Sequence, residues 1–310
     1  MGDSADARVA PGSGQYAAAM QPPDNIVHLL DVVRRQHSTR WVLLPVGGEH
    51  VNLWRGLYPD GSSVILKEGD GLDREIAVYE AVRGPFLPRL IAADATMGFL
   101  ALEDLSDCAR PPPWTDRQHE LVLQALDGVA SASAPPHLPR AGRRAITDGW
   151  QRVAADPSGL LGLFVCTRRW LEGALDALQE AEARAVVDGD SLLHMNPRAE
   201  NLLVGPDRAV LLDWRWAAVG NPLVDRAMFA IGRALDGGPG PESIVGDEPG
   251  IAAAMAGWFA SEAGRKDGHP SVRAFQFDQL TVSLPWAARA LGLPDPLDGG
   301  SCFGGVGRSM

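Results

Sequence analysis

The chain has 310 residues, of which 45% are hydrophobic, and it carries a formal net charge of -11. This length and apolar content suit two packed lobes rather than one small core. The acidic balance excludes a basic surface for nucleic acid or anionic lipid, and it favours cationic small molecules as partners. Widely spaced cysteines, the absence of a secretory signal pattern and the lack of any apolar run of ~18 residues predict a soluble, cytoplasmic chain without a membrane span.

The part of the chain up to residue 107 predicts a disordered tail followed by a small lobe built on strands. Residues 1–23 are rich in Gly, Ala, Ser and Pro and show no periodicity, so we expect a disordered tail. From Asp24 onward, apolar residues at helical spacing predict a first helix. The lobe over 24–107 then contains predicted strands at 41–46, 51–57, 63–67, 90–94 and 98–104, with a helix at 72–82 after the third strand.

The remainder of the chain, residues 108–310, changes character after a run of three prolines and predicts a mainly helical lobe. Long helical patterns run over 115–132 and 159–186. Both helical patterns precede a strand-and-loop region at 192–214. Strands in the first part and helices in the second predict a bilobal α+β fold with a five-stranded antiparallel sheet in its N-terminal lobe.

The most informative segment, residues 192–214, reads LLHMNPRAENLLVGPDRAVLLDW. A polar loop lies between apolar strands, and it is followed by the apolar strand 210–213, which ends at Asp213. This segment resembles the catalytic loop and metal-binding turn of protein kinases and aminoglycoside phosphotransferases, in which His-x-Asp is followed by Asn and then by an apolar strand ending in Asp. The resemblance implies the protein-kinase-like fold of the small-molecule antibiotic kinases.

The resemblance also implies roles for individual residues of the loop. His194 corresponds to the loop-stabilising histidine, and Asn201 and Asp213 correspond to the Mg²⁺ ligands. Arg198 falls where protein kinases carry a lysine near the transferred phosphate. Asp225, at the start of a predicted helix, corresponds to the aspartate that braces the loop by accepting backbone N–H bonds.

One position departs from the family pattern, because Asn196 stands where the family has its catalytic Asp. An amide can hydrogen-bond a substrate hydroxyl but cannot accept its proton, so we expect catalysis to be impaired. Two explanations stay open. The favoured one is an Asp-to-Asn change introduced to trap a substrate complex, because the rest of the motif is retained; the other is a natural chain that has lost or rebuilt its activity.

The first lobe supplies the residues that the resemblance assigns to the nucleotide. Lys67 ends an apolar strand in a chain that otherwise uses arginine, and it matches the kinase lysine that binds the α and β phosphates. Glu75, on the following helix, is its predicted partner. The pair Gly47 and Gly48 forms the predicted phosphate-covering turn, and the segment from Glu103 to Leu105 resembles the hinge that binds adenine through backbone groups.

By resemblance, the chain transfers the γ-phosphate of ATP, or alternatively of GTP, to a hydroxyl of a small polar natural product such as a cationic antibiotic. A metabolic kinase of the sugar, choline or homoserine type and a nucleotide-binding pseudokinase are the alternatives. A protein kinase is disfavoured, because the interval between Asp213 and Asp225 is too short for a peptide platform. Candidates for contact with the acceptor are Asp247, Glu248, Glu262 and the aromatic face of Trp286.

Overall fold

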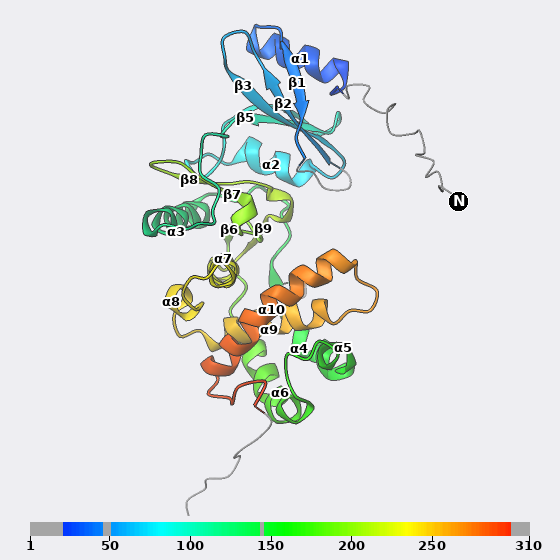
Figure 1. Cartoon of the computed structure of the whole chain (residues 1–310), viewed down its shortest axis with the longest axis vertical. Helices are drawn as coiled ribbons and strands as arrows, with labels where there is room; N and C mark the ends of the chain where they lie inside the picture. Colours follow the sequence, from blue (N-terminus) through cyan, green and yellow to red (C-terminus); the bar gives the residue numbers. More distant parts are fainter. Residues whose placement is uncertain (1–20, 46–50, 143–145, 299–310) are drawn as a thin grey trace, which may run out of the picture. The chain divides into compact units, whose positions relative to one another are not determined.

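The structure is a computed structural model that describes residues 21–45, 51–142 and 146–298 of the chain. The chain divides into two units (Figure 1). The first unit consists of Met1–Leu72 and Leu90–Asp104, and the second of Asp73–Arg89 and Leu105–Met310. Helix α2 (Asp73–Ala81) is therefore grouped with the helical unit, although strands precede and follow it in the sequence.

The first unit contains the five-stranded antiparallel sheet that the sequence predicts, in the order β1-β2-β3-β5-β4. One helix, α1 (Asp24–Arg34), precedes it. Alternating apolar residues and, between β2 and β3, the turn that contains Gly61 account for this antiparallel pairing. The strands are β1 (Arg40–Leu43), β2 (Val51–Leu57), β3 (Ser63–Gly69), β4 (Leu90–Asp94) and β5 (Phe99–Glu103).

Strand β3 presents different residues to the two faces of this sheet. Leu66 is fully buried and belongs to a cluster that includes Trp54 of β2 and Leu30 of α1, so α1 covers that face (Figure 1). Side chains alternate along a strand, which places Lys67 on the opposite face. There it lies in register with Leu53 and Leu100, and it is 8% exposed.

Among the described residues, the second unit is mainly helical, with two pairs of short strands and two 3₁₀ turns around the region 192–214. Strand β6 pairs with β9 and β7 pairs with β8, both antiparallel. The helices are α2, α3 (Asp116–Ser131), α4 (Gly149–Ala155), α5 (Ser158–Leu161), α6 (Arg168–Ala183), α7 (Leu223–Leu235), α8 (Glu242–Val245), α9 (Pro249–Ala263) and α10 (Pro270–Ala290). The strands and 3₁₀ turns are β6 (Ser191–Leu193), η2 (Ala199–Asn201), β7 (Leu202–Val204), β8 (Ala209–Leu211), η3 (Trp214–Trp216) and β9 (Ala218–Gly220).

The helix predicted over 159–186 is divided into α5 and α6, so its predicted continuity was wrong. Phe164 between the two helices has a left-handed backbone, with φ 58°. Thr167 then starts α6 as an N-cap, because its hydroxyl accepts the N–H of Trp170. The apolar periodicity continues through the break, which is why the pattern alone did not locate it.

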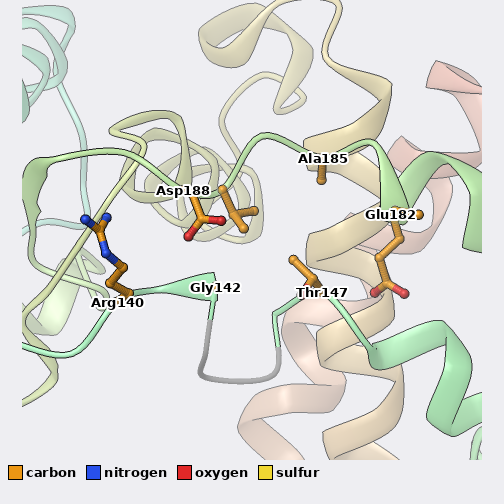
Figure 2. Close-up of a pocket in the computed structure, with 8 residues that line it drawn as sticks. Arg140, Gly142, Thr147, Glu182, Ala185 and Asp188 are labelled. Atoms are coloured by element: carbon orange, nitrogen blue, oxygen red, sulfur yellow. The ribbon is translucent and has the colours of Figure 1, made fainter.

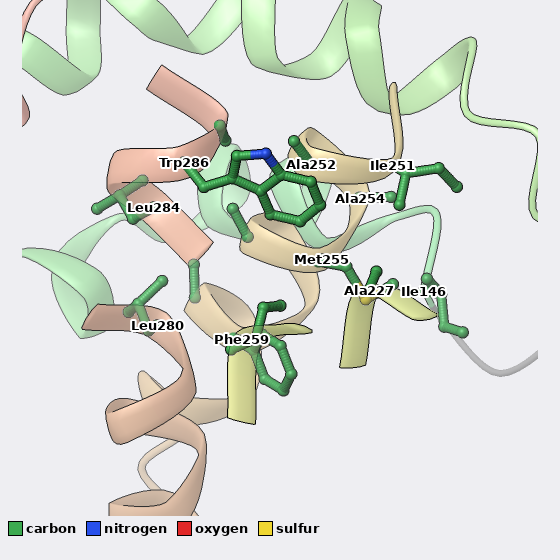
Figure 3. Packing of buried hydrophobic residues seen from close by; sticks show 14 of the residues in the cluster. Ile146, Ala227, Ile251, Ala252, Ala254, Met255, Phe259, Leu280, Leu284 and Trp286 are labelled. Carbon is green, nitrogen blue, oxygen red and sulfur yellow. The ribbon is translucent and has the colours of Figure 1, made fainter. Parts of the chain in front are cut away.

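The core of the second unit lies where α9 and α10 pack against α4, α6 and α7 (Figure 3). Trp286 belongs to this core with Leu284 and Phe259, and it is 1% exposed. The interpretation of Trp286 as a wall of the acceptor pocket was therefore wrong, because its ring is enclosed by apolar side chains. Within the described ranges, the structure contains no helix with the length and apolar character that a bilayer crossing requires.

Candidate active site

The β7–β8 hairpin brings Asn201 and Asp213 together at its open end. Leu202 pairs with Leu211, and the next backbone bond runs from Leu212 N–H to the Asn201 carbonyl oxygen at 2.8 Å. Asn201 is therefore opposite Leu212, and Asp213 follows directly. Cross-strand register thus brings the backbones of the two predicted Mg²⁺ ligands close together at the same end of the hairpin.

The backbone at Asp213 adopts a left-handed conformation, with φ 65° and ψ 63°. This region is unfavourable for residues with a Cβ, and such strain is concentrated at functional sites. The conformation ends β8 and starts η3, so the carboxylate group occupies a sharp turn. Arg215 Nε donates to Asp213 Oδ1 at 2.8 Å. Arg215 was not identified from the sequence, although a cation so close to a predicted metal ligand was a signal available there.

The loop between β6 and η2 is fixed by His194, whose side chain is fully buried. Its Nε2 lies 2.8 Å from the Leu212 carbonyl oxygen, and its Nδ1 accepts the N–H of Asn196 at 3.2 Å. These partners select the neutral imidazole with its proton on Nε2. His194 therefore ties the loop to the end of β8, directly before Asp213.

Asn196 is held by its backbone at two points. Its N–H donates to His194 Nδ1, and its carbonyl oxygen accepts a hydrogen bond from Asn201 Nδ2 at 3.0 Å. The amide of Asn201 thus uses its nitrogen inside the loop, and its Oδ1 is the oxygen suited to a metal ion. The position at which kinases carry the catalytic Asp is therefore fixed in space whichever side chain it has.

Asp225, in the first turn of α7, braces the same loop. Its Oδ2 accepts the N–H of His194 at 2.6 Å, and its Oδ1 accepts the N–H of Met195 at 2.7 Å. Met195 has a left-handed φ of 66°, which turns the two N–H groups toward one carboxylate. Burial raises the pKa of Asp225 to about 6, and the two backbone hydrogen bonds oppose that rise.

Arg198 extends from the catalytic loop to α10. Its guanidinium carbon lies 4.5 Å from the ring centroid of Phe275, a cation–π contact, and its Nε lies 3.5 Å from Glu200 Oε2. Phe275 was not identified from the sequence, because no periodicity relates a loop residue to a helix so far along the chain. The contact links the predicted phosphate-binding cation to the helices after residue 240.

Of the carboxylates predicted to contact the acceptor, Glu262 already has two partners. It lies 2.9 Å from Arg152 and 3.2 Å from Arg265. This ion-pair network occupies Glu262 within the helical unit. We therefore give Glu262 no acceptor role, and the assignments of Asp247 and Glu248 stay predictions.

The predicted nucleotide residues are distributed over the chain. Lys67 and Glu103 lie in β3 and β5 of the first unit, and Glu75 lies on α2, where it is 1% exposed. The pairing of Lys67 with Glu75 stays a prediction. The Leu105 carbonyl oxygen accepts the N–H of Cys108 at 3.0 Å. The phosphate-covering turn at Gly47 and Gly48 lies outside the described residues.

A cavity of about 710 Å³ lies elsewhere in the second unit (Figure 2). In this view, Arg140 and Asp188 lie on one side, and Thr147 and Glu182 on the other. The complete set of described lining residues is Arg140, Gly142, Thr147, Glu182, Ala183, Ala185, Val187 and Asp188. Since none of these is a residue predicted for phosphoryl transfer, we do not place the candidate active site in this cavity.

The donor set at the hairpin fits Mg²⁺ better than a metal bound by protein side chains alone. Among the described residues, no group of three or more His, Cys, Asp or Glu side chains is arranged to hold a metal ion. Mg²⁺ usually takes one or two protein oxygens and completes its octahedron with water and phosphate oxygens. Asn201 Oδ1 and the Asp213 carboxylate match that requirement.

The antiparallel sheet, the helical second unit and the catalytic-loop geometry together define the protein-kinase-like fold of small-molecule kinases, as predicted. A choline/ethanolamine kinase family protein from Mesorhizobium loti has this fold, with a TM-score of 0.56 and 16% identity over 87% of this chain and 97% of that chain. Choline kinase LicA from Streptococcus pneumoniae has a TM-score of 0.55 and 12% identity over 87% and 98% of the two chains.

A thermostable mutant of aminoglycoside phosphotransferase APH(4)-Ia, in a ternary complex with ADP and hygromycin B, is also similar. Its TM-score is 0.54 and its identity 16%, over 89% of this chain and 100% of that chain. No family model and no curated protein sequence matches the chain. The structural similarities therefore show the fold, and the function is inferred from the site.

Proposed function

We propose that the chain is an ATP-dependent phosphotransferase that acts on a hydroxyl of a small polar molecule. The observation that supports this most strongly is the register of the β7–β8 hairpin, which sets the backbone of Asn201 opposite Leu212, the residue before Asp213, next to a loop braced by His194 and Asp225. This arrangement combines hard oxygen ligands with a fixed backbone at position 196. Phosphoryl transfer requires chiefly such positioning and charge.

Each residue has a defined task in this proposal. Asn201 and Asp213 hold Mg²⁺, which when bound neutralises charge on the phosphate oxygens. Arg198 supplies a further cation near the transferred group, and Lys67 binds the α and β phosphates. The backbone of the hinge from Glu103 to Leu105 binds the adenine, and ATP is the expected donor, with GTP as the alternative.

Asn196 limits the chemistry that this site performs. Its side chain orients a hydroxyl through the amide oxygen, but it takes up no proton as the new bond to phosphorus forms. We propose that the chain as given is a slow phosphotransferase and that Asp at this position is the active form. A pseudokinase remains the second candidate, and the observation that favours it is Asn196 itself.

For the acceptor, we propose a hydroxylated natural product, with a cationic antibiotic as the first class to test. The net charge of -11 favours cations, and APH(4)-Ia, which has the same fold, is described with hygromycin B. Resistance or self-protection in the cytoplasm is the corresponding role. The choline and ethanolamine kinases of the same fold make a metabolic acceptor the alternative.

The decisive experiment is calorimetry with Mg²⁺ and AMP-PNP, a non-hydrolysable ATP analogue. We expect binding to the chain as given, because the phosphate and metal groups do not depend on residue 196. Asp213→Ala should lose the Mg²⁺-dependent part, whereas Asp207→Ala, in the exposed turn between β7 and β8, should retain it. No heat and no thermal stabilisation up to millimolar nucleotide would exclude the phosphotransferase proposal.

A further inference from the structure

Arg215 forms an ion pair with Asp213, the carboxylate that binds Mg²⁺ in the proposed function. Its Nε donates to Asp213 Oδ1 at 2.8 Å, and the two side chains are 37% and 26% exposed. A hydrogen bond between ions at this distance is charge-assisted and stronger than one between neutral groups. The Arg215 guanidinium thus compensates charge on the Asp213 carboxylate.

The backbone on both sides of this ion pair is fixed. Trp214 is fully buried, and its indole N–H donates to the Leu211 carbonyl oxygen at 3.0 Å. The carbonyl oxygen of Arg215 accepts a hydrogen bond from Arg74 of α2 at 3.0 Å. With η3 held at these points, the movable part is the Arg215 side chain, whose partial exposure leaves room to turn toward solvent.

A divalent cation at Asp213 and a guanidinium on the same carboxylate repel each other. The Coulomb energy of like charges a few ångströms apart is substantial even when solvent screens it, so the two cations bind in competition. The left-handed backbone at Asp213 is independent evidence that this carboxylate is held for a task. An arginine paired with it in the metal-free state keeps the carboxylate oriented and compensates its charge.

We propose that Arg215 is a placeholder for the metal: its guanidinium occupies Asp213 in the metal-free protein and is displaced when a divalent cation binds. This inference rests on the proposed function, since it requires a metal at Asp213. The consequence is a lower metal affinity than the same oxygen ligands would have without Arg215. Occupancy of the site then depends on the divalent-cation concentration.

The test measures Mn²⁺ binding without nucleotide, by electron paramagnetic resonance of the free ion. Arg215→Gln should bind Mn²⁺ roughly three- to tenfold more tightly than the wild-type chain, because one competing charge is removed. Arg215→Lys keeps the charge and should stay close to the wild type. Arg184→Gln, at the exposed end of α6, removes a charge away from Asp213 and should change nothing.

Asp213→Asn shows whether the measured Mn²⁺ binds at Asp213. Circular dichroism establishes that each variant is folded. Unchanged or weaker Mn²⁺ binding by Arg215→Gln, with binding lost in Asp213→Asn, would overturn the placeholder while leaving the metal site intact. If Mn²⁺ binding is the same in Asp213→Asn and in the wild type, the metal assignment itself fails, and the placeholder fails with it.

Discussion

At the residue scale, polar side chains in and beside the loop between β6 and η2 bond to the main chain of that loop. His194 bonds the Asn196 N–H, Asn201 bonds the Asn196 carbonyl oxygen, and Asp225 bonds two further N–H groups. The loop is thereby fixed by bonds within the protein. Under the proposed function, we expect any chemical deficit of this chain to lie in the side chain at position 196.

Restoring the acid at that position tests this view. Asn196→Asp should raise the phosphotransfer rate by about 10²- to 10⁴-fold, the usual contribution of a positioned general base. Acceptor binding should change far less, because Asn and Asp are nearly isosteric and both accept a hydrogen bond from a hydroxyl. ADP release by the two proteins, with the same acceptor and saturating ATP, measures the difference. Equal rates would mean that position 196 supplies no base.

The brace at Asp225 leads to a prediction about stability. Asp225→Ala leaves the buried N–H groups of His194 and Met195 without their acceptor, which should lower the free energy of unfolding by about 1–3 kcal/mol. Urea denaturation measures this change. Asp207→Ala, which removes an exposed carboxylate, is the matched control and should lie within about 0.5 kcal/mol of the wild type. Equal stability of the two variants would show that Asp225 does not stabilise the loop.

At the element scale, α4, α6 and α9 meet around a buried acid. Glu182 of α6 is 3% exposed, and it accepts the N–H of Gly149 at 3.0 Å and that of Trp150 at 3.2 Å, so it caps α4 from another helix. A Cβ at Gly149 would lie 2.1 Å from the carbonyl carbon of Gly257 in α9. Glycine is therefore required where α4 crosses α9, and the three helices are fixed together.

The acid at this junction predicts a pH-dependent stability. Burial raises the pKa of Glu182 from 4.5 to about 7, while the N–H groups of Trp150 and Gly149 oppose the rise. Because its pKa in the folded state lies above its unfolded value, the folded chain binds the extra proton between these values. The contribution of Glu182 to stability is therefore fully present below the unfolded pKa and is lost as the pH rises through about 7.

Urea denaturation at about pH 5 and about pH 8 measures this dependence. Between the two conditions, the wild type should lose on the order of 1–3 kcal/mol more unfolding free energy than Glu182→Gln, which does not titrate. Glu180→Gln, on the exposed face of α6, should follow the wild-type profile. Parallel profiles for the wild type and Glu182→Gln would show that Glu182 has an ordinary pKa.

At the scale of the whole molecule, charge is the property most relevant to the acceptor. The chain has 39 acidic and 28 basic residues, and it has a sequence pI near 5.1. An acidic protein raises the local concentration of cations, and salt screens this attraction over a Debye length of ~8 Å at physiological ionic strength. The binding of a cationic acceptor should therefore weaken as the salt concentration rises, whereas the binding of a neutral acceptor should not.

This dependence predicts how a panel of acceptors should behave. With Mg²⁺ and AMP-PNP present, hygromycin B and other cationic hydroxylated compounds should stabilise the chain thermally more at low than at high ionic strength. Neutral sugars serve as the comparison and should show no such dependence. Thermal-shift measurements at two salt concentrations separate the classes. Larger shifts with neutral compounds, independent of salt, would redirect the search to metabolic acceptors.

Local sequence patterns determined the elements and the motif of this protein. Alternation and turn residues predicted the meander of β1, β2 and β3, although β3 continues beyond Lys67, where the predicted strand ends, to Gly69. The pattern within 192–214 predicted a polar loop between apolar strands and a strand that ends at Asp213. These features depend on residues close in sequence, whose relation a periodicity of two or a hairpin register specifies.

Tertiary structure decided the contacts that no local pattern specifies. The contact of Arg198 with Phe275 joins a loop to a distant helix, and the cap that Glu182 places on α4 joins two helices. The pairing of Arg215 with Asp213 depends on a left-handed backbone imposed by the turn after β8. Such contacts result from packing and from backbone conformations that the whole unit stabilises, so the side chains involved are recognisable only once the chain is folded.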